Sequence, residues 1–203
     1  EMSASLVGSE MCIRDRLEVI SLILEEFNKK RILCNIAIKK ACMELNLKLP
    51  EIYYVQLDDI KLFDQDGNVV SYDYRDVGYK VKSILFIPKE YVIYINVDLF
   101  QNEMNMLVKC YQTARQMYHT IQVYNQLQSK ELSESTTTVN QWRYCYIERK
   151  NSKPSGITPV QADMMAFSIV MMQKYHYINI EFKDNDYFGW DNLLKKMKNS
   201  YFK

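Results

Sequence analysis

Two runs of apolar residues at helical spacing constrain the fold of this chain more than any other feature of its sequence. Within residues 17–45 and again within residues 100–121, apolar side chains recur at steps of three and four. This spacing places them on one face of a helix. We therefore expect one helix of about seven turns that starts at Leu17 and ends before Pro50, and another over residues 99–128.

Three segments between these helices have the composition of β-strands. Residues 51–57, 79–87 and 91–97 are rich in β-branched and aromatic side chains, and the last two should form a hairpin. Residues 64–68 contain an Asp-Gly turn signal that predicts two further short strands. A calcium loop would need spaced acidic residues and a distal glutamate that are missing here, so a plain turn is expected.

The chain after the second helix is expected to be helical. Thr158, Pro159 and Gln161 have the pattern of a helix start, with an N-cap, a proline at the first position and a capping-box partner. Three further elements are expected: a short helix around Trp142, a strand or turn over residues 177–182, and a helix from about Trp190. This order predicts an α+β fold with long helices packed on a short twisted sheet.

Composition limits the classes of partner. Lys and Arg number 26 and Asp and Glu number 25, so the formal net charge of +1 gives no global basic field for nucleic acid or an acidic membrane. The five cysteines are odd in number and form no C-x-x-C pair, which is typical of reduced thiols in a cytoplasmic protein. No apolar run reaches the roughly 18 residues of a membrane span. We expect neither a nucleic-acid patch nor a membrane segment.

Residues 1–16, EMSASLVGSEMCIRDR, lack the basic and apolar regions of a signal peptide. Within them, SLVGSEMCIRDR resembles a translated sequencing-adapter artefact of the kind found at the ends of assembled genes. A disordered natural N-terminus is the alternative. Both interpretations predict no function for this segment, and a single domain over residues 17–203.

A polar stripe follows the second long helix. Gln112, Arg115, His119 and Gln122 are three or four residues apart, so they share a face of that helix. Such a stripe either faces solvent or lines a cleft. His119 and His176 are the only histidines of the chain, which excludes most histidine-based metal sites unless cysteines or carboxylates supply the remaining ligands.

Residues 115–122, RQMYHTIQ, resemble the HExRHxxQ signature of bacterial zincin metallopeptidases of the ImmA/IrrE-related type, many of them associated with mobile elements. In that signature two histidines one turn apart bind zinc and the glutamate acts on the attacking water. His119 corresponds to the second zinc histidine and Gln122 to the trailing glutamine. Residues 159–167, PVQADMMAF, resemble the helix start that supplies the third, acidic ligand in this family. The resemblance implies a zincin-like domain.

The departures from the signature decide the predicted function. Arg115 replaces the first zinc histidine, and its guanidinium stays charged and repels a metal. Gln116 replaces the catalytic glutamate, and an amide cannot accept a proton from water. Gln161 stands at the acidic position, with Asp163 as a possible substitute, so His119 and Asp163 would be the vestigial ligands. We predict an inactive metallopeptidase homologue without cofactor that acts as a binding or regulatory module.

The resemblance also implies where a partner would bind. The predicted cleft comprises six residues: Arg115, Gln116, His119, Gln122, Gln161 and Asp163. The parent cleft binds extended peptide by strand addition, so the expected partner is a peptide segment or another protein. Two alternatives stay open. One is an active zinc metallopeptidase with displaced ligands, namely His119, Asp163 and either Cys110 or His176, and the other is a structural protein unrelated to zincins.

Overall fold

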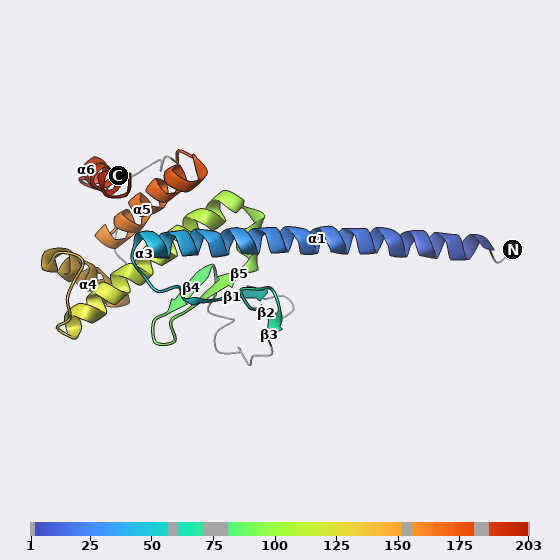
Figure 1. Ribbon diagram of the computed structural model, residues 1–203, viewed down its shortest axis with the longest axis horizontal. Helices are drawn as coiled ribbons and strands as arrows, with labels where there is room; N and C mark the ends of the chain where they lie inside the picture. The colour runs from blue at the N-terminus through green and yellow to red at the C-terminus, as the bar shows by residue number, and fades with distance from the viewer. Residues whose placement is uncertain (1–2, 57–60, 71–80, 152–155, 181–186, 203) are drawn as a thin grey trace.

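The computed structural model describes five stretches of the chain: residues 3–56, 61–70, 81–151, 156–180 and 187–202. In these stretches five α-helices pack with a five-stranded mixed sheet, which confirms the predicted α+β class (Figure 1). None of the described helices combines the length and apolar character needed to cross a membrane.

The first helix, α1 (Ser3–Glu44), starts well before the predicted residue, Leu17. Residues 3–16 contain no proline and a single glycine, so local propensity lets the helix continue where apolar periodicity ends. Its other end matches the prediction. Asn46 adopts a left-handed φ of 51°, and the amide of Leu47 bonds the Cys42 carbonyl at 2.8 Å, which closes the last turn.

The sheet has five strands: β1 (Glu51–Gln56), β2 (Lys61–Phe63), β3 (Val69–Val70), β4 (Ile84–Ile87) and β5 (Val92–Asn96). Their order is β3-β2-β1-β5-β4, with β1 and β5 parallel and the other pairs antiparallel. The β4–β5 hairpin is therefore confirmed. The turn from β2 to β3 is confirmed as well, and Asp64 Oδ1 accepts bonds from the amides of Asp66 and Asn68 at 2.9 and 2.8 Å.

Strand β4 is shorter than the expected segment 79–87. Residues 82–83 form a bend, Val81 has no regular secondary structure, and residues 79–80 lie outside the described stretches. The bend is fixed from β5: the backbone amide of Asn96 bonds the Ser83 carbonyl at 2.8 Å, and its side chain donates to the Val81 carbonyl at 3.2 Å. The backbone and the side chain of Asn96 thus both hold the segment that precedes β4.

Four helices follow a short 3-10 turn, η1 (Val97–Gln101): α3 (Glu103–Leu127), α4 (Thr136–Asn151), α5 (Pro159–His176) and α6 (Trp190–Tyr201). Helix α3 begins later than predicted because Asn102 caps it, accepting a bond from the Asn105 amide at 2.9 Å. The capping box of α5 is confirmed, since the Thr158 and Gln161 side chains each accept from the other's backbone amide.

The strand or turn expected over residues 177–182 is not a strand in its described part. Residues 177–180 have no regular secondary structure, and residues 181–182 lie outside the described stretches. Tyr177 takes a left-handed φ of 57° at the end of α5, and the amide of Ile178 turns back to the Met172 carbonyl at 3.3 Å. This helix ending redirects the chain before a strand can form.

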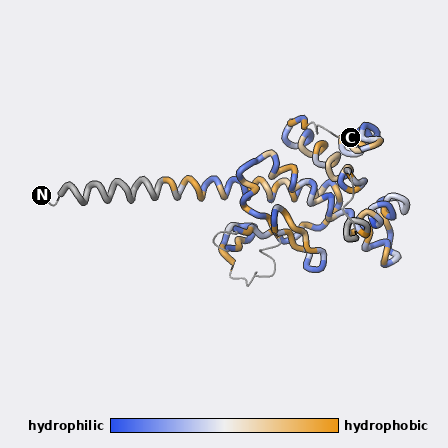
Figure 2. Tube along the Cα trace, turned by 180° about the vertical axis from the view of Figure 1, so that it is seen from behind, coloured by the Kyte–Doolittle hydropathy of each residue, from blue (hydrophilic) through white to orange (hydrophobic). Residues whose placement is uncertain are grey.

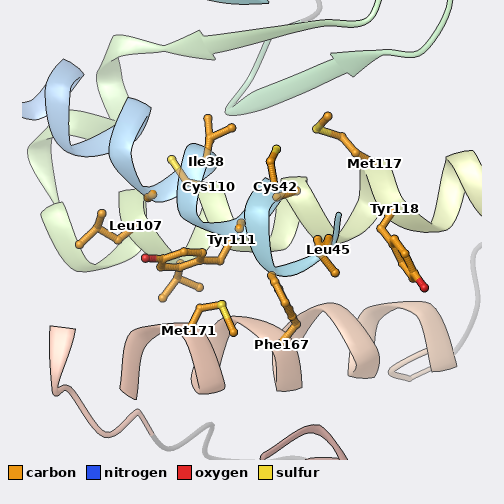
Figure 3. Packing of buried hydrophobic residues seen from close by; sticks show 14 of the residues in the cluster. Ile38, Cys42, Leu45, Leu107, Cys110, Tyr111, Met117, Tyr118, Phe167 and Met171 are labelled. Atoms are coloured by element: carbon orange, nitrogen blue, oxygen red, sulfur yellow. The ribbon is translucent and has the colours of Figure 1, made fainter. Parts of the chain in front are cut away.

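Helix α3 lies at the centre of the molecule. It packs against α1, α4, α5 and β4, and fully buried side chains such as Ile38, Tyr111 and Phe167 fill the space between α1, α3 and α5 (Figure 3). A smaller cluster that includes Val55 and Tyr94 covers the other face of the sheet. A helix surrounded in this way has little surface left for water, so its polar stripe must find partners inside the protein.

Candidate functional site

Helices α3 and α5 bring three charged or titratable side chains together. Arg115 and His119 lie one turn apart on α3, and Asp163 lies in the second turn of α5, facing them. All three are buried, with 4%, 0% and 8% of their surfaces exposed. This part of the stripe is therefore largely shielded from solvent.

The carboxylate of Asp163 binds both residues of α3. Its Oδ2 accepts bonds from Arg115 Nε at 2.6 Å and from His119 Nε2 at 2.7 Å, and its Oδ1 accepts from Arg115 Nη2 at 3.2 Å. The pairing with the guanidinium is bidentate, the strongest geometry for such an ion pair. We call these three residues the Arg-Asp-His cluster.

Further groups from α4, α6 and the loop before α4 surround the guanidinium. Arg115 Nη1 lies 3.4 Å from the Tyr201 hydroxyl, and Nη2 lies 3.8 Å from Glu134 Oε1. Three aromatic rings flank the guanidinium carbon, with centroids at 4.8, 5.5 and 5.7 Å: Tyr118, Phe167 and Trp142. A buried cation held by carboxylates and π-faces has its charge compensated without water.

Burial and the ion pair act in opposite directions on the acid–base groups. Burial alone would raise the pKa of Asp163, but the charge of Arg115 and the bond from His119 outweigh it, so that pKa lies below its usual value. Burial lowers the pKa of His119, and the bond to Asp163 offsets this only in part. At neutral pH the cluster therefore holds a cationic Arg115, an anionic Asp163 and a neutral His119.

A neutral His119 that donates from Nε2 keeps a lone pair on Nδ1. This Nδ1 atom is buried and has no hydrogen-bond partner among the described residues. The imidazole instead stacks against the Trp142 ring, with centroids 4.0 Å apart and planes tilted by 33°. Packing rather than hydrogen bonding thus fixes this side of the ring.

The residues of the cluster do not fit a zinc ion. The guanidinium of Arg115 already occupies the carboxylate, and both ligand atoms that remain, Asp163 Oδ2 and His119 Nε2, bind each other. Within the part of the chain that the structure describes, no group of three His, Cys, Asp or Glu side chains is placed to hold a metal.

The displaced ligands of the alternative lie elsewhere. Cys110 is fully buried beside Cys34 of α1, and this contact and burial raise the pKa of its thiol well above the ordinary value. His176 Nε2 lies 2.9 Å from the Tyr111 hydroxyl near the end of α5. The structure brings neither residue to the Arg-Asp-His cluster.

Two predicted cleft residues, Gln116 and Gln161, lie in a separate groove. This groove has a volume of about 480 Å³ and runs between β4, α3 and α5. We name it the glutamine groove, and its lining includes Ser83, Ile84, Lys109, Gln112, Gln116, Gln161 and Met164. The predicted single cleft is thus two places, a buried cluster and an open groove, and residues of α3 and α5 contribute to both.

Gln122 belongs to neither place. Its side chain is buried, and its Oε1 accepts a bond from the Ser133 amide at 2.9 Å, which ties the loop before α4 to α3. Sequence reasoning missed Glu134 and Tyr201 as neighbours of Arg115. They are 19 and 86 residues away from it in the chain, as the residue numbers show, and no local pattern marks either of them.

A second pocket opens at the edge of the Arg-Asp-His cluster. It has a volume of about 390 Å³, and its lining includes Arg115, Asp163, Tyr187, Lys196 and Tyr201. Comparisons with protein families, with curated proteins and with solved structures find no match to this chain. A function is therefore proposed from the geometry of the cluster and of the glutamine groove, together with the sequence resemblance.

Proposed function

We propose that the chain is a catalytically inactive metallopeptidase homologue that acts as a peptide-binding module. One observation carries the proposal: the guanidinium of Arg115 binds the same carboxylate oxygen as His119, so a side-chain cation takes the role that a metal has in a zincin. The sequence resemblance supports the same ancestry. From this resemblance we also infer that the chain is a cytoplasmic protein that occurs in bacteria or on mobile elements.

The chemistry of the site argues against hydrolysis. A zincin needs a metal-bound water and a carboxylate that takes a proton from it. Arg115 and Asp163 neutralise each other in a buried ion pair. Gln116 lines the glutamine groove, where its amide can bind but cannot act as a base.

The glutamine groove has the features of a site for an extended segment. Strand β4 is last in the sheet order, and β5 is its only partner among the described strands. An added segment can bond the free edge of such a strand through its backbone. Gln112 and Gln116 then offer amides to that backbone, and Met164 gives a wall for alternate apolar side chains.

Zinc binding by variants tests the inactive-homologue part of the proposal. The unmodified protein should purify without stoichiometric zinc, whereas Arg115→His should gain zinc affinity by orders of magnitude because it presents two histidines and Asp163 to one ion. Gln128→His at the exposed end of α3 is the matched control and should gain none. Metal content is measured by mass spectrometry and affinity by competition with a chelator.

Two results would overturn that part. One is a tightly bound zinc in the unmodified chain that His119→Ala removes, and the other is no gain of zinc binding by a folded Arg115→His variant. The peptide part has its own test: peptides selected from a random displayed library should bind the unmodified chain and lose affinity with Gln112→Ala plus Gln116→Ala. Gln128→Ala should bind as the unmodified chain does. Equal binding by both variants, or no selected peptide, contradicts a peptide site in the groove.

A further inference from the structure

The N-terminal half of α1 extends beyond the rest of the molecule (Figures 1 and 2). At 42 residues the helix is about 63 Å long. Large aliphatic side chains on it are exposed where it leaves the body, among them Leu22 at 65% and Ile23 at 61%. A helix that carries such side chains into water gains little stability by itself, so this surface requires a partner.

One line of side chains on α1 has an ordered pattern. Leu22, Glu25, Lys29 and Ile32 follow one another at steps of three, four and three, so they share one face of the helix. All four are exposed, and they lie opposite the face that buries residues such as Ile38 in the core. We call them the α1 stripe.

The α1 stripe is complementary to itself. Read from either end it is apolar, charged, charged, apolar, and its midpoint falls at residue 27, where the charge changes sign. An antiparallel second copy crossing at that level brings Leu22 against Ile32 of the second copy. The same crossing brings Glu25 against Lys29 of the second copy, twice over by symmetry. A parallel copy would instead place Glu25 against Glu25, which is unfavourable.

We propose that two copies of this chain associate through antiparallel pairing of their α1 helices at the level of residue 27. The contact is isologous, as closed two-fold dimers require. The projecting half of each α1 then runs along the outer face of the other α1, where Ile36 and Met43 are exposed at 41% and 71%. The pairing thus covers apolar side chains on both halves of the helix.

Sedimentation equilibrium of the full chain with charge variants tests this pairing. The unmodified protein should be a dimer at micromolar concentrations, and Glu25→Lys or Lys29→Glu should each raise its dissociation constant by about tenfold or more. The combined Glu25→Lys plus Lys29→Glu should restore the dimer, because the complementarity is then reversed rather than lost. Lys195→Glu at an exposed position of α6 is the control and should have no effect.

Apolar variants separate dimer loss from misfolding. Leu22→Asp plus Ile32→Asp should give a monomer with an unchanged circular dichroism spectrum, since both side chains are exposed in the single chain. A monomer at all concentrations of the unmodified protein would overturn the proposal and leave the α1 stripe to a partner of another kind. Two further results would overturn the proposal. One is an unchanged dissociation constant of the dimer in the single charge variants, and the other is failure of the combined variant to restore the dimer.

Discussion

The Arg-Asp-His cluster and the glutamine groove both lie between α3 and α5, and they differ in burial and in charge. The cluster is charged and buried, with His119 fully inaccessible, whereas the groove is open and lined by hydroxyls, amides, apolar side chains and one lysine. A hydrolytic site needs charge and access in one place. In the cluster the charges of Arg115 and Asp163 neutralise each other, and the residues that line the groove include one cation, Lys109, but no carboxylate or histidine.

Removing one side of the ion pair should have the largest effect. Asp163→Ala leaves the buried guanidinium of Arg115 without its carboxylate, and we expect a loss of about 3 to 5 kcal/mol in the free energy of unfolding. Gln116→Ala in the groove should stay within about 0.5 kcal/mol. Urea denaturation measures both. Similar losses for the two variants would mean that the cluster and the groove do not differ in their contribution to stability.

Replacing the whole pair should cost less than breaking it. Arg115→Met plus Asp163→Leu removes both charges and keeps apolar volume, so its free energy of unfolding should exceed that of Asp163→Ala by about 2 kcal/mol or more. The same urea titration applies. A double variant no more stable than Asp163→Ala would show that the ion pair has packing partners, such as the ring of Trp142, that apolar side chains cannot replace.

Acid should weaken the cluster in two steps. The pKa of His119 is lowered in the folded state, so its contribution is complete above the unfolded value of about 6.5 and is lost as pH falls below it. The pKa of Asp163 is also lowered, so its contribution is lost only below about pH 3.9. His119→Asn should remove the first step, measured as the decrease in unfolding free energy between pH 7.5 and 5.

His176 is the control for the first step, because burial lowers its pKa as well. His176 is only partly buried, whereas His119 is fully buried, and His176 contacts Tyr111, away from the cluster. His176→Asn should therefore retain most of the decrease between pH 7.5 and 5. If His176→Asn removes the decrease and His119→Asn leaves it, the acid sensitivity arises outside the cluster.

The smallest effect should come from the capping box beside the groove. Thr158→Ala removes the side-chain oxygen that accepts from the Gln161 amide at 3.3 Å, at a cost of about 1 kcal/mol. Gln161→Ala should cost less, since its side chain only returns a bond to the Thr158 amide. Thermal melting of both variants checks this order. The reverse order would indicate that Gln161 has a further role in the groove.

Local patterns in the sequence predicted the elements that depend on local contacts. The α5 capping box and the end of α1 involve residues within a few positions of one another. The start of α1 at Ser3 escaped prediction because apolar periodicity reports burial, and a helix outside the body can continue on propensity alone.

The candidate site was predicted only in part, for a geometric reason. The sequence resemblance aligned the third ligand with Gln161 and left Asp163 as a substitute. Side chains two residues apart on a helix differ by about 200° in direction, so only one of the two can reach Arg115 on α3. Asp163 does so, across 48 positions of sequence from Arg115, and Gln161 turns to the groove. The spacing of residues within α5 alone does not show whether Gln161 or Asp163 faces Arg115.

Arg115 is a residue of the chain and not a bound ion, and this difference affects the solution conditions under which the fold is stable. A metal ion stabilises a protein by mass action, so its effect depends on the free concentration of that ion. The guanidinium that binds Asp163 is part of the chain, and its local concentration does not change with the surroundings. We therefore expect the ion pair between α3 and α5 to contribute the same free energy of unfolding in metal-poor and metal-rich solution, and in the presence of chelators.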